Sequence, residues 1–106
     1  MPARLLYRSR FIYPDGAIRE MVLWKLPKAA AERRHGLKYR LHYSSANSTI
    51  TIRYDNEAGK GDHRHYMDHE DPYPFLDVET LVADFLADIE KVREEAEYGK
   101  EKRDKG

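Results

Sequence analysis

The chain contains no cysteine, which excludes disulfides, thiol nucleophiles and zinc sites with cysteine ligands. It also lacks an apolar run of the roughly 18 residues that a membrane-spanning helix needs. No apolar signal-peptide segment follows the first charged residue, Arg4. We therefore expect a cytoplasmic protein that does not enter a membrane, and the 106 residues allow one hydrophobic core.

The chain also has no net charge, because 19 basic residues balance 19 acidic residues. This balance hides two halves of opposite sign. Residues 1–60 carry twelve Lys and Arg against five Asp and Glu, whereas residues 61–106 carry seven against fourteen. A solvated surface with interleaved charges explains the asymmetry, and so does a basic face that meets a polyanion while the acidic residues lie elsewhere.

The first half of the chain has the alternating apolar and polar pattern of β-strands. These strands are expected at about residues 4–13, 17–26, 37–44 and 49–55. Pro14-Asp15-Gly16 predicts a turn between the first two strands. The alternation places Val22, Trp24, Leu41 and Ile52 in the core. Successive hairpins predict a four- to five-stranded antiparallel sheet, arranged as a meander, with one apolar and one basic face.

The last part of the chain has the period of an amphipathic helix. Asp77 is a suitable N-cap, and apolar residues recur at steps of three and four between Val78 and Val92. This pattern predicts a C-terminal helix over about 78–97 that packs on the apolar face of the sheet, which gives an α+β fold. Residues 1–97 should form a single domain, and the charged residues 98–106 should form a disordered tail.

A polar segment, residues 53–66, lies between the predicted sheet and the helix. His63 and His65 are two residues apart, so on an extended chain they project to the same side. Asp62 and Arg64 project to the other side. The segment is too polar for a core and is rich in side chains that suit acid–base chemistry or the binding of phosphate.

Three interpretations of the two histidines remain open. They are locally hydrogen-bonded surface residues, or metal ligands together with a nearby carboxylate, or acid–base catalysts acting on an RNA phosphodiester. Nothing at a diagnostic spacing supplies a third metal ligand, so we expect neither a metal nor another cofactor. In the third interpretation, one imidazole takes a proton from a ribose 2′-OH and another group protonates the leaving 5′-oxygen. Asp55 or Asp62 would orient one imidazole.

Two sets of candidate site residues follow from this interpretation. The candidate catalytic residues are His63, His65, Asp62, Arg64 and Lys60. The candidate RNA-binding residues are Arg53, Asp55, Asn56, Lys38, Arg40 and His42. The outer sheet face should also bring Arg8 and Arg10 close to this second set, because the hairpins place all these basic positions on one side. The alternative is a non-catalytic binding module whose basic sheet face docks an acidic protein or a nucleic acid.

Three stretches of the sequence resemble one known family. They are Arg-Tyr-Asp-Asn-x-x-Gly-Lys-Gly-Asp-His-Arg-His at 53–65, Pro-Tyr-Pro-Phe at 72–75 and Leu-Val-Ala-Asp-Phe-Leu-Ala-Asp-Ile at 81–89. This pattern is similar to that of the TumE family, and the resemblance covers roughly residues 4–93. The family consists of small prokaryotic proteins regarded as toxin components of toxin–antitoxin pairs.

The resemblance implies a cytoplasmic toxin that is neutralised by a cognate antitoxin, usually a protein with a helix-turn-helix DNA-binding domain. The expected assembly is a homodimer or a hetero-oligomer with that antitoxin. Many toxins of this size, with an antiparallel sheet and helices, are ribonucleases, and this analogy suggests a metal-independent endoribonuclease with an RNA substrate.

Overall fold

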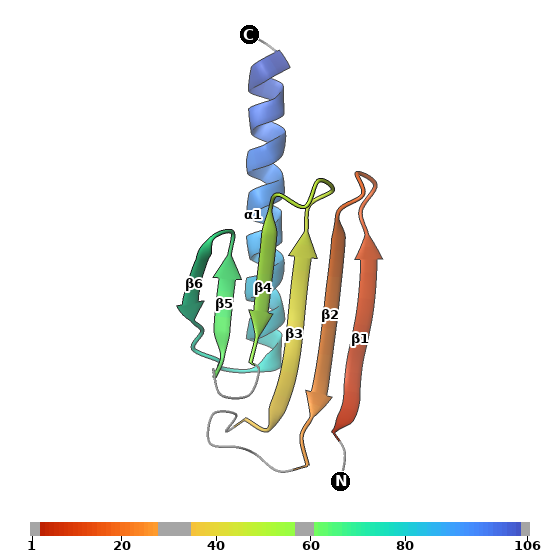
Figure 1. The fold of residues 1–106 in the computed structure, drawn as a ribbon, viewed down its shortest axis with the longest axis vertical. Coiled ribbons are helices and arrows are strands. Elements are labelled where there is room, and N and C mark those ends of the chain that lie inside the picture. Colours follow the sequence, from red (N-terminus) through yellow and green to blue (C-terminus); the bar gives the residue numbers. More distant parts are fainter. Residues whose placement is uncertain (1–2, 28–34, 57–60, 105–106) are drawn as a thin grey trace. The chain divides into compact units, whose positions relative to one another are not determined.

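The structure is a computed structural model that describes residues 3–27, 35–56 and 61–104. The chain divides into two compact units, Met1–Phe75 and Leu76–Gly106. The first unit contains all the described strands and the second contains the described helix (Figure 1).

The first unit is one antiparallel sheet in which each strand pairs with its neighbour in sequence, in the order β1-β2-β3-β4-β5-β6 (Figure 1). The strands are β1 (Arg4–Ile12), β2 (Ile18–Lys25), β3 (Leu37–Ser44), β4 (Thr51–Asp55), β5 (His63–Tyr66) and β6 (His69–Pro72). The predicted antiparallel sheet is therefore confirmed. The predicted number of strands is wrong, because the sheet has six strands and not four to five.

The additional strands form a third hairpin, in which β5 pairs with β6. The connection between them contains Met67 in a left-handed backbone conformation with φ 58°. The residues of this hairpin are mostly polar, so they lack the apolar alternation that predicts a strand. Backbone hydrogen bonding defines both strands, and a hydrophobicity pattern does not detect it.

The turn between β1 and β2 forms as its residue types predict. Gly16 has a φ of +95°, a conformation that L side chains rarely adopt. Asp15 Oδ1 accepts a hydrogen bond from the backbone N–H of Ala17 at 3.0 Å. These contacts reverse the chain and let β2 return beside β1.

One face of the sheet is apolar. Its buried apolar residues include Met21, Leu23, Tyr39, Leu41, Tyr43, Ile52 and Tyr54. The predicted core positions Leu41 and Ile52 are confirmed, whereas Val22 and Trp24 lie on the opposite face and are only partly buried. Strand β2 has apolar residues on both faces, so its own alternation does not determine which face is buried. The pairing with β3 determines it, because Leu23 lies opposite Tyr39 and Met21 lies opposite Leu41.

The second unit contains the helix α1 (Val78–Asp104). Asp77 is its N-cap, as predicted, because Asp77 Oδ1 accepts a hydrogen bond from the N–H of Thr80 at 2.6 Å. Hydrogen bonding to Thr80 lowers the pKa of Asp77. The helix continues past the predicted end near residue 97 to Asp104, across Gly99 and through Lys100, Glu101, Lys102 and Arg103, which are good helix formers. Within the described residues, no helix combines the length and apolar character needed to cross a membrane.

Candidate functional site

The face of the sheet opposite the apolar face collects most of the candidate site residues, and we call it the polar face. Directly paired residues of antiparallel strands project to the same side of a sheet. One row of paired residues consists of Arg10, Glu20, His42, Arg53, His65 and Glu70. The next row consists of Arg8, Val22, Arg40, Asp55, His63 and Pro72. The predicted gathering of the basic strand residues on one face is confirmed.

Arg53 connects two members of the site. Its Nη2 lies 2.9 Å from His65 Nε2 in a hydrogen bond. A guanidinium only donates, so His65 Nε2 accepts this bond and a neutral His65 carries its proton on Nδ1. Arg53 Nε also lies 2.8 Å from Asp55 Oδ2 in an ion pair. Burial lowers the pKa of His65, and the nearby Arg53 cation lowers it further, so the arrangement favours a neutral imidazole.

Asp55 and His63 form the buried part of the site. His63 Nε2 lies 2.5 Å from Asp55 Oδ1, and both residues are at most 5% exposed. The other ring nitrogen of His63, Nδ1, lies 3.0 Å from the carbonyl oxygen of Gly61. Asp55 Oδ1 nevertheless receives no hydrogen bond within the described part of the chain. A carboxylate oxygen and the bare lone pair of a ring nitrogen repel each other at this distance, so the contact is favourable when Nε2 carries a hydrogen or when both atoms bind one cation.

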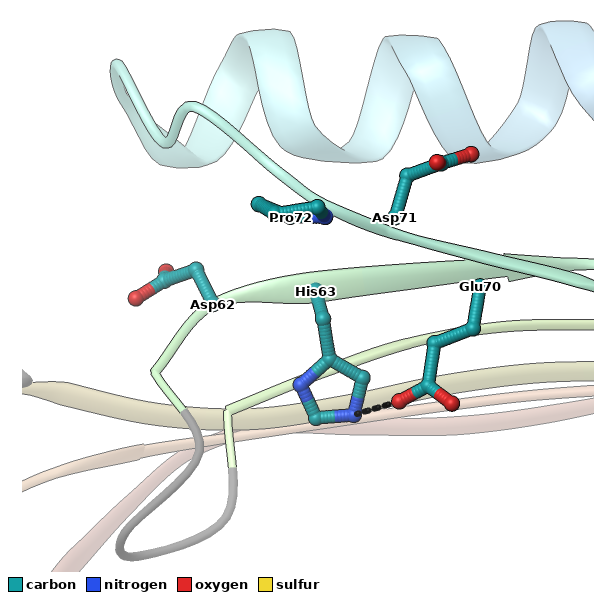
Figure 2. Close-up of a pocket in the computed structure, with 5 residues that line it drawn as sticks. All are labelled: Asp62, His63, Glu70, Asp71 and Pro72. Carbon is teal, nitrogen blue, oxygen red and sulfur yellow. Dashed lines mark ion pairs between the residues drawn. The ribbon is translucent and has the colours of Figure 1, made fainter.

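Glu70 belongs to the site and was missed by the sequence analysis. Its Oε1 lies 3.4 Å from His65 Nε2 and 3.9 Å from His63 Nε2. Figure 2 shows Glu70 and His63 pointing toward each other. Glu70 and His65 lie at equal distances from the two-residue connection Met67-Asp68, so recognition of that hairpin would have predicted their pairing.

A pocket of about 260 Å³ opens beside His63 (Figure 2). Its lining residues are Asp62, His63, Glu70, Asp71 and Pro72. On the side of the histidines its carboxylate is Glu70, whereas Asp62 and Asp71 project toward the side of the apolar face, where Asp62 contacts Tyr39 and Asp71 pairs with Arg64. The negative charge of Glu70 makes this end of the polar face less favourable for a phosphate. The favourable side for an anion lies over β3 and β4, where Arg53 and Arg40 provide positive charge.

Two candidate catalytic residues project to the side of the sheet opposite His63 and His65. Asp62 Oδ2 accepts a hydrogen bond from the Tyr39 hydroxyl at 2.8 Å and contacts His35 Nε2 at 2.9 Å. Burial and this carboxylate raise the pKa of Tyr39. Arg64 Nε donates to the Tyr54 hydroxyl at 2.9 Å, on the side of the apolar face.

A third candidate catalytic residue, Lys60, lies outside the described residues.

The candidate RNA-binding residues separate into exposed and buried groups. Lys38 and Arg40 are exposed on β3, and His42 is partly buried on the same strand. Burial lowers the pKa of His42, and the neighbouring Arg40 and Arg53 lower it further. These positions are available to a ligand on the polar face.

Asn56 cannot contact a ligand as expected, because it is fully buried. Its Oδ1 accepts a hydrogen bond from the N–H of Tyr39 at 3.0 Å, and its Nδ2 donates to the carbonyl of Leu37 at 2.8 Å. Asn56 therefore joins the end of β4 to β3. Its assignment as an RNA-binding residue is corrected to a structural role.

The fold and the site define a small α+β protein whose basic sheet face carries a cluster of histidines and carboxylates. The family model described as "Toxin TumE" matches residues 2–93. The chain therefore belongs to the TumE toxin family, as its resemblance predicted. No curated protein and no solved structure matches the chain.

Proposed function

We propose that this chain is the toxin of a toxin–antitoxin pair and acts in the cytoplasm as an endoribonuclease. The observation that carries the proposal is the position of Arg53, whose guanidinium lies between His65 and Asp55 on the polar face. A cation beside a neutral imidazole suits phosphodiester chemistry, because it attracts the phosphate while the imidazole accepts a proton. Membership of the TumE toxin family supports the toxin role.

In the proposed reaction, His65 is the general base. A ribose 2′-OH approaches from the side of Arg53 and takes the place of its guanidinium on His65 Nε2. The 2′-oxygen attacks the phosphorus, and its proton passes to His65. The bond from phosphorus to the 5′-oxygen breaks, which leaves a 2′,3′-cyclic phosphate and a 5′-hydroxyl.

His63 donates the proton that the leaving 5′-oxygen requires. The Gly61 carbonyl holds Nδ1, and Nε2 lies beside Asp55, so the leaving oxygen takes the place of the Asp55 carboxylate at Nε2 and receives the proton there. Arg53 and Arg40 stabilise the charge on the phosphate. The proposal assigns this role to Arg53 instead of Arg64, because Arg64 belongs to the opposite side of the sheet.

The proposal includes the partners. An antitoxin with a helix-turn-helix DNA-binding domain neutralises the toxin in a hetero-oligomer.

We also propose that the apolar stripe of α1, which includes Leu81 and Phe85, packs on the apolar face of the sheet, because each surface needs another apolar surface to cover it. Residues 1–97 would then fold as one domain.

The direct test combines growth with RNA cleavage. We expect expression of the chain alone to arrest growth, and coexpression of its neighbouring antitoxin gene to restore it. Purified protein should cleave a labelled RNA and leave a cyclic phosphate end, whereas a DNA of the same sequence, which lacks the 2′-OH, should stay intact. Arrest of growth without RNA cleavage would retain the toxin and reject the ribonuclease.

A divalent metal site is a second candidate, and a separate observation supports it. One ligand atom from each of Asp55, His63 and His65 lies within 4.8 Å of the others, and Asp55 Oδ1 has no hydrogen bond among the described residues. The Gly61 carbonyl beside His63 Nδ1 directs Nε2 toward the carboxylate, as carbonyls do behind metal-bound histidines. A divalent ion held there would activate a water or polarise a phosphate oxygen.

Chelation separates the two chemistries. Acid–base catalysis predicts that cleavage survives EDTA and that added Zn²⁺ or Mn²⁺ does not increase it. The metal chemistry predicts that EDTA abolishes cleavage, that one of these ions restores it, and that calorimetry detects binding of that ion. Replacement of His65 should remove the metal binding, whereas His69→Ala, a change at an exposed histidine of β6, should leave it unchanged.

A further inference from the structure

The outer edge of β1 is the longest unpaired strand edge in the described part of the chain. Strand β1 has nine residues, contains no proline, and pairs only with β2 in the sheet order. Its large apolar residues are exposed by 44 to 59%, and they are Leu5, Leu6, Tyr7, Phe11 and Ile12. A long apolar edge offers unpaired backbone N–H and C=O groups to any extended chain, and monomeric proteins usually protect such edges.

The opposite edge of the same sheet is protected. Strand β6 has only four residues, all exposed, and its sequence His-Glu-Asp-Pro combines two acidic residues with a proline. Short length, charge and proline are the common ways of blocking further strand addition. The sheet is therefore blocked at one edge and open at the other.

We propose that the outer edge of β1 binds an extended acidic segment of a partner protein, which adds to the sheet as a seventh strand. The charges of β1 determine the chemistry of this segment, because the strand contains three arginines and no acidic residue. Arg8 and Arg10 project on the polar face, whereas Tyr7 and Phe11 project on the apolar face. The complementary strand places acidic residues opposite the arginines and apolar residues opposite the aromatic rings.

The charge pattern disfavours a second copy of this chain as the occupant. In a symmetric antiparallel pair, the central residue lies opposite itself, and the neighbours on either side lie opposite each other. With Ser9 at the centre, Arg8 would lie opposite Arg10. With Arg8 or Arg10 at the centre, that arginine would lie opposite its own copy. Each of these registers places like charges directly across the strands, which is destabilising.

The bulge of β1 does not alter this comparison. The pairing of β1 with β2 shifts between Leu5 and Tyr7, and it is regular from Tyr7 to Ile12. The arginines that oppose self-pairing lie within the regular segment, so a partner strand of six residues has an uninterrupted edge to pair with.

The occupant of the edge follows from the proposed function. In the toxin–antitoxin pair proposed above, the partner is the antitoxin, and its identity rests on that proposal. The edge and its charges do not depend on ribonuclease activity.

A nine-residue synthetic peptide of alternating Glu and Val tests the inference, with a peptide of alternating Lys and Val as its control. In NMR titrations of the full chain, the Glu peptide should protect the amides of β1 from exchange, and the Lys peptide should not. The double variant Arg8→Glu, Arg10→Glu should weaken binding of the Glu peptide about tenfold or more, because two favourable cross-strand pairs become unfavourable. Lys38→Glu makes the same kind of change on β3 and should have little effect.

The same double variant supplies a result that misfolding cannot imitate, since it should gain affinity for the Lys peptide. Equal binding of both peptides, or protection at β6 instead of β1, would overturn the inference. Sedimentation and amide exchange of the chain without peptide provide a separate check. A dimer whose β1 amides are protected from exchange would identify a second copy as the occupant. Peptide binding by a protein without ribonuclease activity would reject the proposed ribonuclease and support the inference about the β1 edge.

Discussion

Replacement of His65 by alanine should lower RNA cleavage about 10²–10⁴-fold, because positioned general acids and bases contribute about that much. The measurement is kcat/KM on a labelled RNA, with circular dichroism to show that the variant is folded. His69→Ala is the matched control, since this histidine is also on the third hairpin but is highly exposed. Full activity in a His63→Ala, His65→Ala double variant would remove both histidines from the reaction.

The pH dependence distinguishes a base from a residue that only holds the fold. Burial and Arg53 lower the pKa of His65 below its ordinary value of 6.5, so the ring stays neutral into mildly acidic solution. Cleavage should therefore persist below pH 6.5 and decline as the pH falls through the lowered pKa. Arg53→Gln removes the neighbouring cation and should move this decline to higher pH. A decline at the same pH in both proteins would contradict the assignment of His65.

Leu41→Ala should lower the free energy of unfolding by about 2–5 kcal/mol, because it removes buried apolar volume and leaves a cavity. Leu41 is fully buried in β3. Urea denaturation measures the loss, and Leu76→Ala, at a residue that is 76% exposed, should change the stability by less than about 0.5 kcal/mol.

Phe85→Ala extends this test to the proposed single domain. If α1 packs on the apolar face of the sheet, this change should cost about as much as Leu41→Ala, within one cooperative transition. Separate transitions for the sheet and the helix would reject the proposed packing. Leu41→Ala would then still report on the sheet alone.

Alternation predicted a strand well where only one of its faces is apolar. In β3, Tyr39, Leu41 and Tyr43 alternate with polar residues, and all three are buried as expected. The same rule failed in β2, where Val22 and Trp24 compete with Met21 and Leu23 for the buried side. Pairing with β3 decides between these alternatives, and such pairing involves residues that are distant in sequence.

The candidate site was predictable to the extent that it depends on local geometry. The two-residue spacing placed His63 and His65 on one side of an extended segment, as the register of β5 confirms. Their contacts with Arg53 and Asp55 depend on how β5 pairs with β4, which sequence spacing does not determine. Glu70 required a hairpin whose connection has Met67 at positive φ, and methionine gives no turn signal.

Because each strand pairs with its neighbour in sequence, the hairpins of the sheet can form in the order in which the chain is synthesised. A growing chain contains all of β1 and β2 before any residue of β5 or β6 exists. Contacts between neighbouring hairpins are local, so the first hairpin needs nothing from the last one in order to pair. His63, His65 and Glu70 are added with the last hairpin of the sheet, before the helix. A nascent chain therefore presents the edge proposed for its partner before it possesses the groups proposed for catalysis.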